Sequence, residues 1–352
     1  MLNIYIPSDL NHKIDKKRLF ILVRPFYSEN GWISDNAQLE KWGIGDGINL
    51  VSKNSEADVV LLPYSINHYI INDLSDYLIK YNTLCEKNNI KAFGYIAGDF
   101  GQSFPEFNNI IYFRMGGFKS QLNERNIGLP AALSDHHLRL FGSDEISIRK
   151  KNKKPVIGYC GYSNRSQIIR AKDSLIYLLE NIRRLINDPR RKDYEIIFPS
   201  GYYRSQILCD LEKYDTIVTN FIHRKKYRAG AISEFQRKTT TLEYYNNIRE
   251  SDYIVCLRGR GNFSIRFYET LMMGRIPIFI DTDCLLPFSD HINWKNHVVW
   301  IDWEERHSVS SIVAQFHERI TDQEFEEMQI KNRNLWKEIL SLNWIFKHLL
   351  EL

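Results

Sequence analysis

Short apolar runs alternate with longer amphipathic stretches along this chain. The short runs are of the kind that form buried parallel strands, and they lie at residues 3–6, 19–23, 59–63, 92–96, 110–113, 155–160, 195–199, 253–257, 276–280 and 298–301. Elsewhere, apolar residues recur at steps of three and four, which predicts helices over residues 73–88, 166–186, 240–249, 265–273 and 322–352. This alternation favours a doubly wound α/β fold.

The stretch from 251 to 280, SDYIVCLRGRGNFSIRFYETLMMGRIPIFI, is predicted to form a strand, a glycine loop, a helix and a second strand. Gly259 and Gly261 allow the loop backbone to turn tightly and to approach a ligand closely. Ser264 stands where a helix N-cap is expected, and Gly274 where a left-handed residue often ends a helix. We therefore expect the N-terminus of this helix to face the loop.

Arg266 falls in the first turn of that helix. Free backbone N–H groups, the helix dipole and a guanidinium together make an anion site that suits a phosphate or diphosphate. Arg266 and Glu269 are three residues apart and share a helix face, so one is placed to bind phosphate and the other to accept ribose hydroxyls. The alternative is a surface ion pair on an ordinary crossover helix.

The same stretch resembles the signature of exostosin-like glycosyltransferases: a strand of the type SDYIVCL, a glycine loop, S-x-R, an acidic residue three further on, and G-x-I-P-I. The match continues through PF at 287–288, Asp290, INW at 292–294 and VV at 298–299. Upstream, EADVVLLPY at 56–64 is similar to an N-terminal strand of that family. Two matched blocks in the right order are more specific than a lone glycine-rich loop.

The resemblance implies the GT-B fold, an α/β architecture in which two Rossmann-like doubly wound domains face a central cleft. We expect an N-terminal acceptor domain over residues 1–148, a nucleotide-sugar donor domain over 149–325, and C-terminal helices over 326–352 that cross back to the N-terminal domain. The charged run RKKNKK at 149–154 is the expected linker, with a membrane-surface or phosphate patch as the alternative.

The resemblance also implies inverting, metal-independent transfer with no required cofactor. The co-substrate would be a nucleoside-diphosphate sugar, expected to be UDP-linked. Arg266 would then act in catalysis by stabilising the departing diphosphate, while Glu269 holds the ribose. The other donor-binding candidates come from the glycine loop, the helix start and a second strand–glycine–helix junction at 155–166: Gly161, Arg165, Arg258, Asn262 and Ser264.

Inversion requires a base that deprotonates the acceptor hydroxyl. Asp99 follows the predicted strand at 92–96, at the edge of an α/β sheet where ligands bind, and is the first candidate for this catalytic role. Its alternative role is to cap the next turn. The rivals for the base are His68, Asp135, His136 and His137.

A metal-dependent site is the rival chemistry. Asp281-Thr282-Asp283 follows a predicted strand and approaches a DxD metal motif, although exostosin-like sequences commonly carry a loop acid at this point. The pair His136-His137 lacks spaced partners for a metal. No GxSxG elbow, Walker loop or HExxH is present.

Composition narrows the class of protein. The 352 residues, 43% hydrophobic and 26% charged, are typical of a soluble globular protein large enough for two domains. The net charge of +4 disfavours a nucleic-acid binder, which stays only a third hypothesis on the basic run FIHRKKYRAG at 221–230. Five scattered cysteines without a CxxC pair indicate reduced core residues.

Without a signal-peptide pattern or an apolar span of about 20 residues, we expect a bacterial-type cytoplasmic protein without a membrane anchor. Peripheral association with the inner face of the membrane is left open.

These observations together predict a glycosyltransferase. It would move a sugar from a nucleoside-diphosphate donor to a glycan or lipid-linked saccharide acceptor, in the biosynthesis of a surface polysaccharide. The alternative from another class is a non-catalytic GT-B-like subunit that binds glycan or nucleotide and scaffolds a partner.

Overall fold

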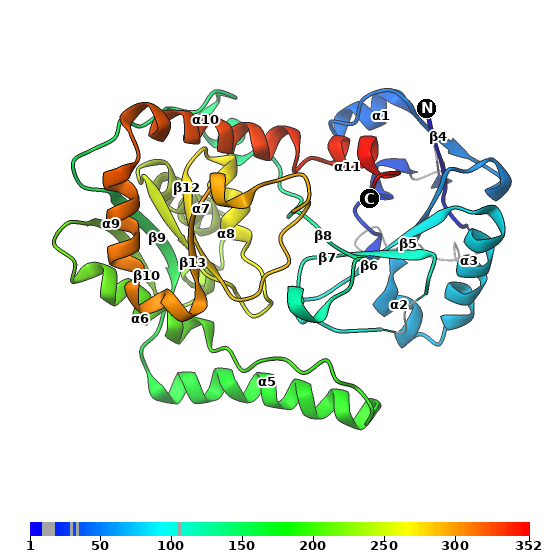
Figure 1. Cartoon of the computed structure of the whole chain (residues 1–352), viewed down its shortest axis with the longest axis horizontal. Coiled ribbons are helices and arrows are strands. Elements are labelled where there is room, and N and C mark those ends of the chain that lie inside the picture. Colours follow the sequence, from blue (N-terminus) through cyan, green and yellow to red (C-terminus); the bar gives the residue numbers. More distant parts are fainter. Residues whose placement is uncertain (9–17, 29–30, 33–34, 105–106) are drawn as a thin grey trace. The chain divides into compact units, whose positions relative to one another are not determined.

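The computed structural model describes residues 1–8, 18–28, 31–32, 35–104 and 107–352. They form two compact units, each built around a parallel sheet (Figure 1). Unit 1 comprises Met1–Ala132, Leu285–Phe288 and Glu338–Leu352, and unit 2 comprises Leu133–Cys284 and Ser289–Lys337. The chain thus returns to unit 1 twice, for a short loop and for its C-terminal end.

Unit 1 contains a six-stranded parallel sheet in the order β4-β1-β5-β6-β7-β8. Its strands are β1 Leu2–Tyr5, β4 Ile48–Val51, β5 Val59–Ser65, β6 Lys91–Ile96, β7 Ile110–Arg114 and β8 Asn126–Gly128, with a small antiparallel pair of β2 Tyr27–Ser28 and β3 Gly31–Trp32. Its helices are α1 Asn36–Lys41, α2 Ile66–Ile71, α3 Ser75–Asn88 and α11 Leu342–His348, with 3-10 turns η3 Arg24–Phe26, η4 Asn54–Glu56 and η5 Lys119–Gln121. Every residue of β5 is buried, which explains its continuous apolar run.

The C-terminal helix α11 belongs to unit 1. Phe346 packs edge-on against Phe26 at a ring distance of 5.7 Å, and Trp344 packs on Phe288 at 4.5 Å. The Asn343 side-chain oxygen also accepts the backbone N–H of Gly45 at 3.1 Å. The expected return of the chain end to the N-terminal unit is therefore confirmed.

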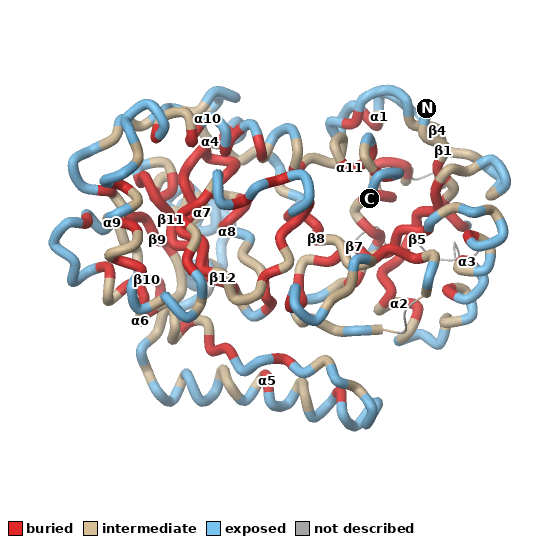
Figure 2. The backbone as a smooth tube through the Cα atoms, viewed as in Figure 1, coloured by how far each residue is buried: buried red, intermediate tan, exposed pale blue. Residues whose placement is uncertain are grey.

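Unit 2 contains a five-stranded sheet in the order β10-β9-β11-β12-β13, all parallel. Its strands are β9 Val156–Tyr162, β10 Val218–Arg224, β11 Tyr253–Cys256, β12 Ile276–Asp281 and β13 Val299–Asp302. Its helices are α4 His136–Phe141, α5 Gln167–Asn187, α6 Ser200–Glu212, α7 Glu234–Arg249, α8 Ile265–Met272, α9 Val309–Arg319 and α10 Asp322–Glu338, with 3-10 turns η6 Tyr227–Gly230, η7 Trp294–Asn296 and η8 Trp303–Ser308. The buried residues of unit 2 concentrate along this sheet (Figure 2).

The predicted strand–loop–helix–strand order of the central stretch matches β11, α8 and β12. All of β11 is buried, as expected for a strand covered on both faces. Gly274 takes a φ of +60° after α8, and a Cβ there would meet the Ile146 side chain at 2.1 Å, so the position requires glycine. Ser264 is the N-cap residue, but its side chain makes no capping hydrogen bond.

The expected α/β class with two Rossmann-like units is confirmed. The boundaries near residues 148 and 325, and the cleft between the domains, stay predictions. The run at 149–154 is not a free linker, because it is fastened to unit 2. The Arg149 backbone N–H donates to Gln329 at 2.9 Å, and the Asn152 carbonyl contacts His317 at 2.7 Å. Within the described part of the chain, no helix is long and apolar enough to cross a membrane.

Two predicted strands are wrong. Residues 19–23 form a buried turn with one isolated bridge from Leu19 to Tyr64, because an apolar run does not distinguish a strand from a buried turn. Residues 195–199 are unpaired, since the backbone N–H and carbonyl of Glu195 bind the side chain of Asn181. Instead, β10 pairs with β9 at this edge of the sheet. The last residues of β10, 221–224, are the first residues of the run 221–230 that was expected to be a basic loop.

Asp252, just before β11, binds both the charged run at 149–154 and the start of β9, so its substitution tests what stabilises unit 2. Its fully buried carboxylate accepts hydrogen bonds from Arg149 Nε at 2.6 Å and from the Val156 backbone N–H at 2.9 Å. Asp252→Asn should lower the free energy of unfolding by about 2–3 kcal/mol, because the charged acceptor is lost where water cannot replace it. Denaturant unfolding measures this. The matched change Glu250→Gln, at an exposed carboxylate 3.8 Å from Arg249, should alter it by less than about 0.5 kcal/mol. Equal effects of the two changes would contradict the assigned role of Asp252.

Candidate active site

Parallel pairing brings the carboxyl ends of all five strands of unit 2 to one edge of the sheet. The loops that follow β9 and β11 emerge at this edge, together with the N-terminus of α8. This is the edge at which α/β sheets bind ligands.

Arg266 reaches from the first turn of α8 to the end of β9. Its Nη2 donates to the Cys160 carbonyl at 2.9 Å, and its guanidinium lies 4.3 Å from the centre of the Tyr159 ring. Its Nε is buried without a hydrogen-bond partner among the described residues. A Cβ at Gly161 would lie 2.6 Å from Nη2 of Arg266, so glycine is what allows the guanidinium to come this close.

Arg204 of α6 adds a second cation to this place. Its Nη2 donates to the Arg258 carbonyl at 2.7 Å, and its buried Nε also lacks a partner in the described structure. Burial is the main cause that lowers the pKa of Arg204, and the positive charge of Arg266 acts in the same direction. Neither guanidinium takes part in a salt bridge within the described residues. Two neighbouring, partly buried cations thus share one nearby carboxylate, that of Glu269, whose charge acts on Arg266 without an ion-pair contact.

Glu269 is held by two tyrosines of α7. The Tyr244 hydroxyl donates to Oε2 at 2.5 Å and the Tyr245 hydroxyl to Oε1 at 2.9 Å. Burial, reinforced by the Glu269 charge, raises the pKa of both phenols, so they remain protonated donors. Each carboxylate oxygen keeps a lone pair for a further donor. His136 packs on Tyr245 at a ring distance of 4.8 Å, and burial lowers its pKa, which favours the neutral imidazole.

Arg258 and Asn262 shape the glycine loop. Arg258 is buried and donates to the carbonyls of Arg260 at 3.0 Å and Gly261 at 3.3 Å. Buried Asn262 donates to the carbonyls of Thr282 at 3.0 Å and Asp283 at 2.8 Å, and its own oxygen accepts from the Thr282 hydroxyl at 2.6 Å. These contacts give both residues a role in positioning the loop; their predicted contact with a donor stays a prediction.

Ser264 and Arg165 lie at the margin of this group. The half-buried Ser264 side chain does not cap α8, which leaves its hydroxyl at the N-terminus of that helix. The Arg165 side chain is 62% exposed and lies 3.6 Å from Glu212, as in a solvated surface ion pair. The structure therefore brings Gly161, Arg266 and Glu269 together and places Arg165 on the surface nearby.

The candidate bases are divided between the two units. Asp99 lies in unit 1, exposed just after β6, and no described side chain or backbone group hydrogen bonds to its carboxylate. His68, also in unit 1, stacks on Tyr64 at 4.6 Å. Asp135 caps α4 and pairs with buried Arg333 at 2.5 Å, and His137 Nδ1 contacts the Ser143 carbonyl at 2.8 Å. These contacts give Asp135 and His137 structural roles, whereas Asp99 has the open carboxylate that a base needs.

The Asp281–Asp283 segment forms a tight turn. Asp281 Oδ1 accepts the backbone N–H of Cys284 at 2.9 Å, and Asp283 has a φ of +64°. Burial raises the pKa of Asp281. Among the residues that the structure describes, no three His, Cys, Asp or Glu side chains gather as metal ligands.

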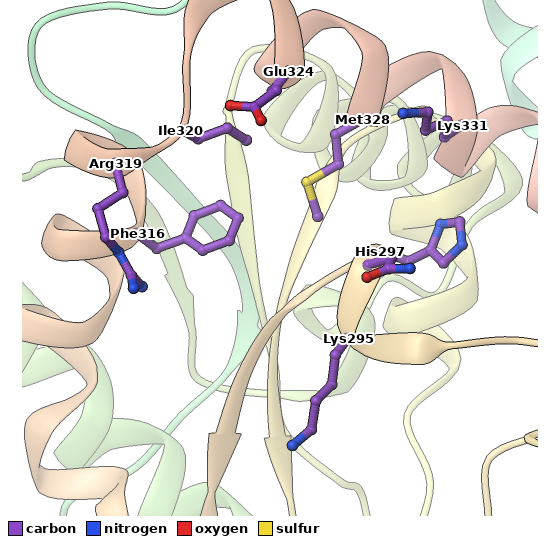
Figure 3. A pocket seen from close by; sticks show the side chains of 9 residues that line it. Lys295, His297, Phe316, Arg319, Ile320, Glu324, Met328 and Lys331 are labelled. Atoms are coloured by element: carbon purple, nitrogen blue, oxygen red, sulfur yellow. The ribbon is translucent and has the colours of Figure 1, made fainter.

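A pocket of about 570 Å³ lies elsewhere in unit 2, beside the start of β13 and between α9 and α10 (Figure 3). Phe316 and Met328 point into it, and the Glu324 carboxylate also faces it (Figure 3). That carboxylate is engaged with the Thr321 backbone N–H and hydroxyl at the start of α10. The pocket is at the opposite, amino-terminal edge of the sheet, so it is separate from the arginine pair.

Sequence reasoning missed Arg204, Tyr244 and Tyr245. Arg204 lies on α6, whose apolar residues lack a clear helical period, so the helix itself was not predicted. The two tyrosines lie on a helix that was predicted, but nothing in the sequence indicates that they meet Glu269 across the fold. The signal that could have found them is the cluster of tyrosines just before the strand that leads to the glycine loop.

Asn262 provides a test of the loop architecture. Asn262→Ala should lower the free energy of unfolding by about 2–3 kcal/mol, because it removes the hydrogen bonds that the buried Asn262 side chain makes with the half-buried carbonyls of Thr282 and Asp283 and with the Thr282 hydroxyl. Asn296→Ala, at an exposed position of unit 2, should change it by less than about 0.5 kcal/mol. Thermal or denaturant unfolding without any ligand decides the matter. An unchanged stability of Asn262→Ala would mean that these hydrogen bonds do not hold the loop.

Comparison with known proteins finds a family model that matches part of this chain, including residues of the candidate site. Residues 201–316 match the family model described as the Exostosin GT47 domain. That range contains Arg204, Tyr244 and the whole of α8, whereas Gly161, Arg165 and α5 precede it.

Individual relatives agree with the family match. Exostosin-1 of Drosophila melanogaster is 32% identical over 24% of this chain and 12% of its own length. A probable glucuronosyltransferase of Oryza sativa is 34% identical over 20% of the chain and 16% of its own, and an Exostosin-1 homolog of Caenorhabditis elegans is 25% identical over 49% and 46%. The chain therefore spans less than half of the length of these relatives.

A solved glycosyltransferase structure from Rickettsia africae ESF-5 aligns over 99% of this chain and 97% of its own, with 12% identity and a TM-score of 0.36. The family match and the relatives by themselves confirm the resemblance expected from the sequence. This chain is exostosin-like, and the residues matched by the Exostosin GT47 model lie in unit 2 except for Leu285–Phe288, which belong to unit 1.

Proposed function

We propose that this protein is an inverting glycosyltransferase that takes a sugar from a nucleoside-diphosphate donor, UDP-linked, and transfers it to a glycan or lipid-linked saccharide. The observation that carries the proposal is the pair of neighbouring guanidiniums, Arg204 and Arg266, at the carboxyl edge of unit 2, which make no salt bridge within the described residues and leave their buried Nε atoms without a hydrogen-bond partner there. Cations that are partly removed from water need a compensating charge, and a diphosphate supplies it.

The geometry assigns separate tasks to the residues of the site. Arg266, at the N-terminus of α8, would stabilise the charge that develops on the leaving diphosphate as the glycosidic bond to the donor breaks. Glu269 would accept the ribose hydroxyls through the lone pairs that Tyr244 and Tyr245 leave open. Asp99 of unit 1 would take the proton of the acceptor hydroxyl as that oxygen attacks the anomeric carbon.

The metal-independent form of this chemistry is supported by the arginine pair, which can carry out the charge stabilisation that a divalent cation performs in other sites. Asp281 commits one oxygen to its own turn. A role in surface polysaccharide biosynthesis and a cytoplasmic location, at the inner face of the membrane, complete the proposal. The alternative is a scaffold subunit that binds nucleotide or glycan without transfer.

Substitution of Arg266 and Glu269 tests the site directly. Arg266→Ala should lower kcat about 100- to 1,000-fold, because leaving-group stabilisation is lost. Glu269→Gln should raise the donor KM about tenfold, because a charged acceptor of the ribose hydroxyls is lost. Purified protein is first screened by thermal shift against UDP, GDP, CMP and dTDP, with and without EDTA, and then assayed for donor hydrolysis or transfer.

Arg165→Ala is the matched control, since that exposed side chain should change turnover by less than about threefold. Nearly normal turnover in both site variants would refute the site assignment. A thermal shift that requires a divalent metal would instead assign the donor site to a metal bound by Asp281 and Asp283. Binding without hydrolysis or transfer would favour the scaffold subunit.

Two glycine substitutions give a second, purely steric test. In Gly161→Ala the new methyl group would lie 2.6 Å from Nη2 of Arg266 and displace the guanidinium, so nucleotide affinity should fall about tenfold. In Gly259→Ala the nearest atom, Nη2 of Arg204, is 3.9 Å away, so affinity should remain within about twofold. Titration calorimetry with the nucleotide that gives the thermal shift measures both. If both variants bind alike, the position of Arg266 does not control the site.

A further inference from the structure

The outer face of α5 is apolar and exposed. Its large aliphatic side chains are between 37% and 82% exposed: Ile168, Leu175, Leu178, Leu179, Ile182, Leu185 and Ile186. At about 3.6 residues per turn they fall within one stripe along the length of the helix. In Figure 2, α5 is pale blue over most of its length. We call this set the α5 stripe.

The opposite face of α5 fastens the helix to unit 2. Tyr177 is buried and donates to the Arg260 carbonyl in the glycine loop at 3.1 Å. Arg184 is buried and forms salt bridges with Glu180 at 2.9 Å and with Glu195 at 3.0 Å. The usual arrangement of an amphipathic helix is therefore reversed: charged groups are satisfied on the inside, and the α5 stripe faces outward.

The segment that follows α5 also exposes apolar groups, and Lys172 places a cation at the edge of the stripe. Tyr194, Ile196 and Ile197, in the segment that follows α5, are 48%, 54% and 47% exposed. Lys172 and Lys192 are exposed, and neither takes part in a salt bridge within the described residues. A large exposed apolar patch with a cation at its margin is a mark of an interaction surface.

We propose that the α5 stripe docks this protein on the surface of a membrane that contains anionic lipid. The helix would lie in the plane of the interface, with its Ile and Leu side chains at the boundary of headgroups and acyl chains. Lys172, at the edge of the stripe, would meet the lipid phosphates. Because α5 precedes the residues matched by the family model, this surface belongs to a part of the chain outside the family match.

Charge favours lipid over a second copy of the chain. Lys172 and Arg183 are eleven residues apart, close to three helical turns, so they lie along the same edge of the stripe. In an antiparallel pair of α5 helices each edge would face the same edge of the other copy, which brings these cations together. Arg183 keeps one carboxylate partner, Glu180, but Lys172 has none. An anionic surface compensates this edge, whereas a second copy repels it.

Vesicle sedimentation with the full chain tests the proposal. At low salt the protein should sediment with vesicles of phosphatidylcholine and phosphatidylglycerol, and much less with phosphatidylcholine alone. The double variant Leu178→Ser and Ile182→Ser should bind at least about tenfold more weakly, because two apolar side chains are lost from the interface. The matched double variant Ile71→Ser and Ile79→Ser, at positions of unit 1 that are 75% and 53% exposed, should bind as the wild type does.

Lys172 provides an independent readout. Lys172→Gln should weaken binding to the anionic vesicles by about fivefold, and added salt should remove the difference. Equal binding by the wild type and the α5 variant would overturn the proposal. The proposal would also be overturned if analytical ultracentrifugation showed a concentration-dependent dimer for the wild type and the Ile71/Ile79 control but not for the α5 variant. Arg266→Ala should bind vesicles normally, so failure of the donor site and failure of the docking surface are distinguishable.

Discussion

The parallel pairing of five strands is the constraint on which unit 2 depends. Because all strands run the same way, every loop that leaves a carboxyl end emerges at a single edge, and residues far apart in sequence meet there. Gly161 comes from β9, Arg204 from α6 and Arg266 from α8, yet they surround the same few ångströms of space. A shift of one strand would separate them.

The arginines of unit 2 are compensated in different ways. The buried Arg184 and Arg333 are paired with carboxylates, as burial of a charge requires. Arg275, also buried, is bound by backbone carbonyls and by the Gln329 side chain. Arg204 and Arg266 donate to carbonyl oxygens, make no salt bridge within the described residues and leave their Nε atoms without partners there. The edge at which an anionic ligand would bind thus keeps donors that the fold itself does not use.

The proposed donor site and the proposed docking surface are joined through one helix. Tyr177 of α5 holds the carbonyl of Arg260, so the element that carries the exposed stripe also holds the glycine loop. A helix laid on a membrane would present that loop at a constant depth. An acceptor linked to a lipid is confined to the same plane, so docking would hold the donor site close to such an acceptor. Neither proposal depends on the other.

The sequence by itself determined the α/β class, the strand–loop–helix–strand order around residues 251–280 and the positions of Arg266 and Glu269 on α8. These follow from local rules: apolar runs of strand length, glycine at a φ of +60° and a shared helix face. It did not determine α6, the turn at 19–23 or the unpaired segment at 195–199, because burial and hydrogen bonds to distant side chains override a local apolar pattern.

The partners of the site were likewise decided only by the tertiary structure. Tyr244 and Tyr245 reach Glu269, and Arg204 reaches the glycine loop, through the packing of helices whose sequences carry no sign of the contact. The predicted amphipathic pattern of α5 did not reveal which of its faces would be covered. That outcome depended on Arg184, whose ion pairs with Glu180 in the same helix and with Glu195 in the segment after it turn the polar side inward and leave the apolar side exposed.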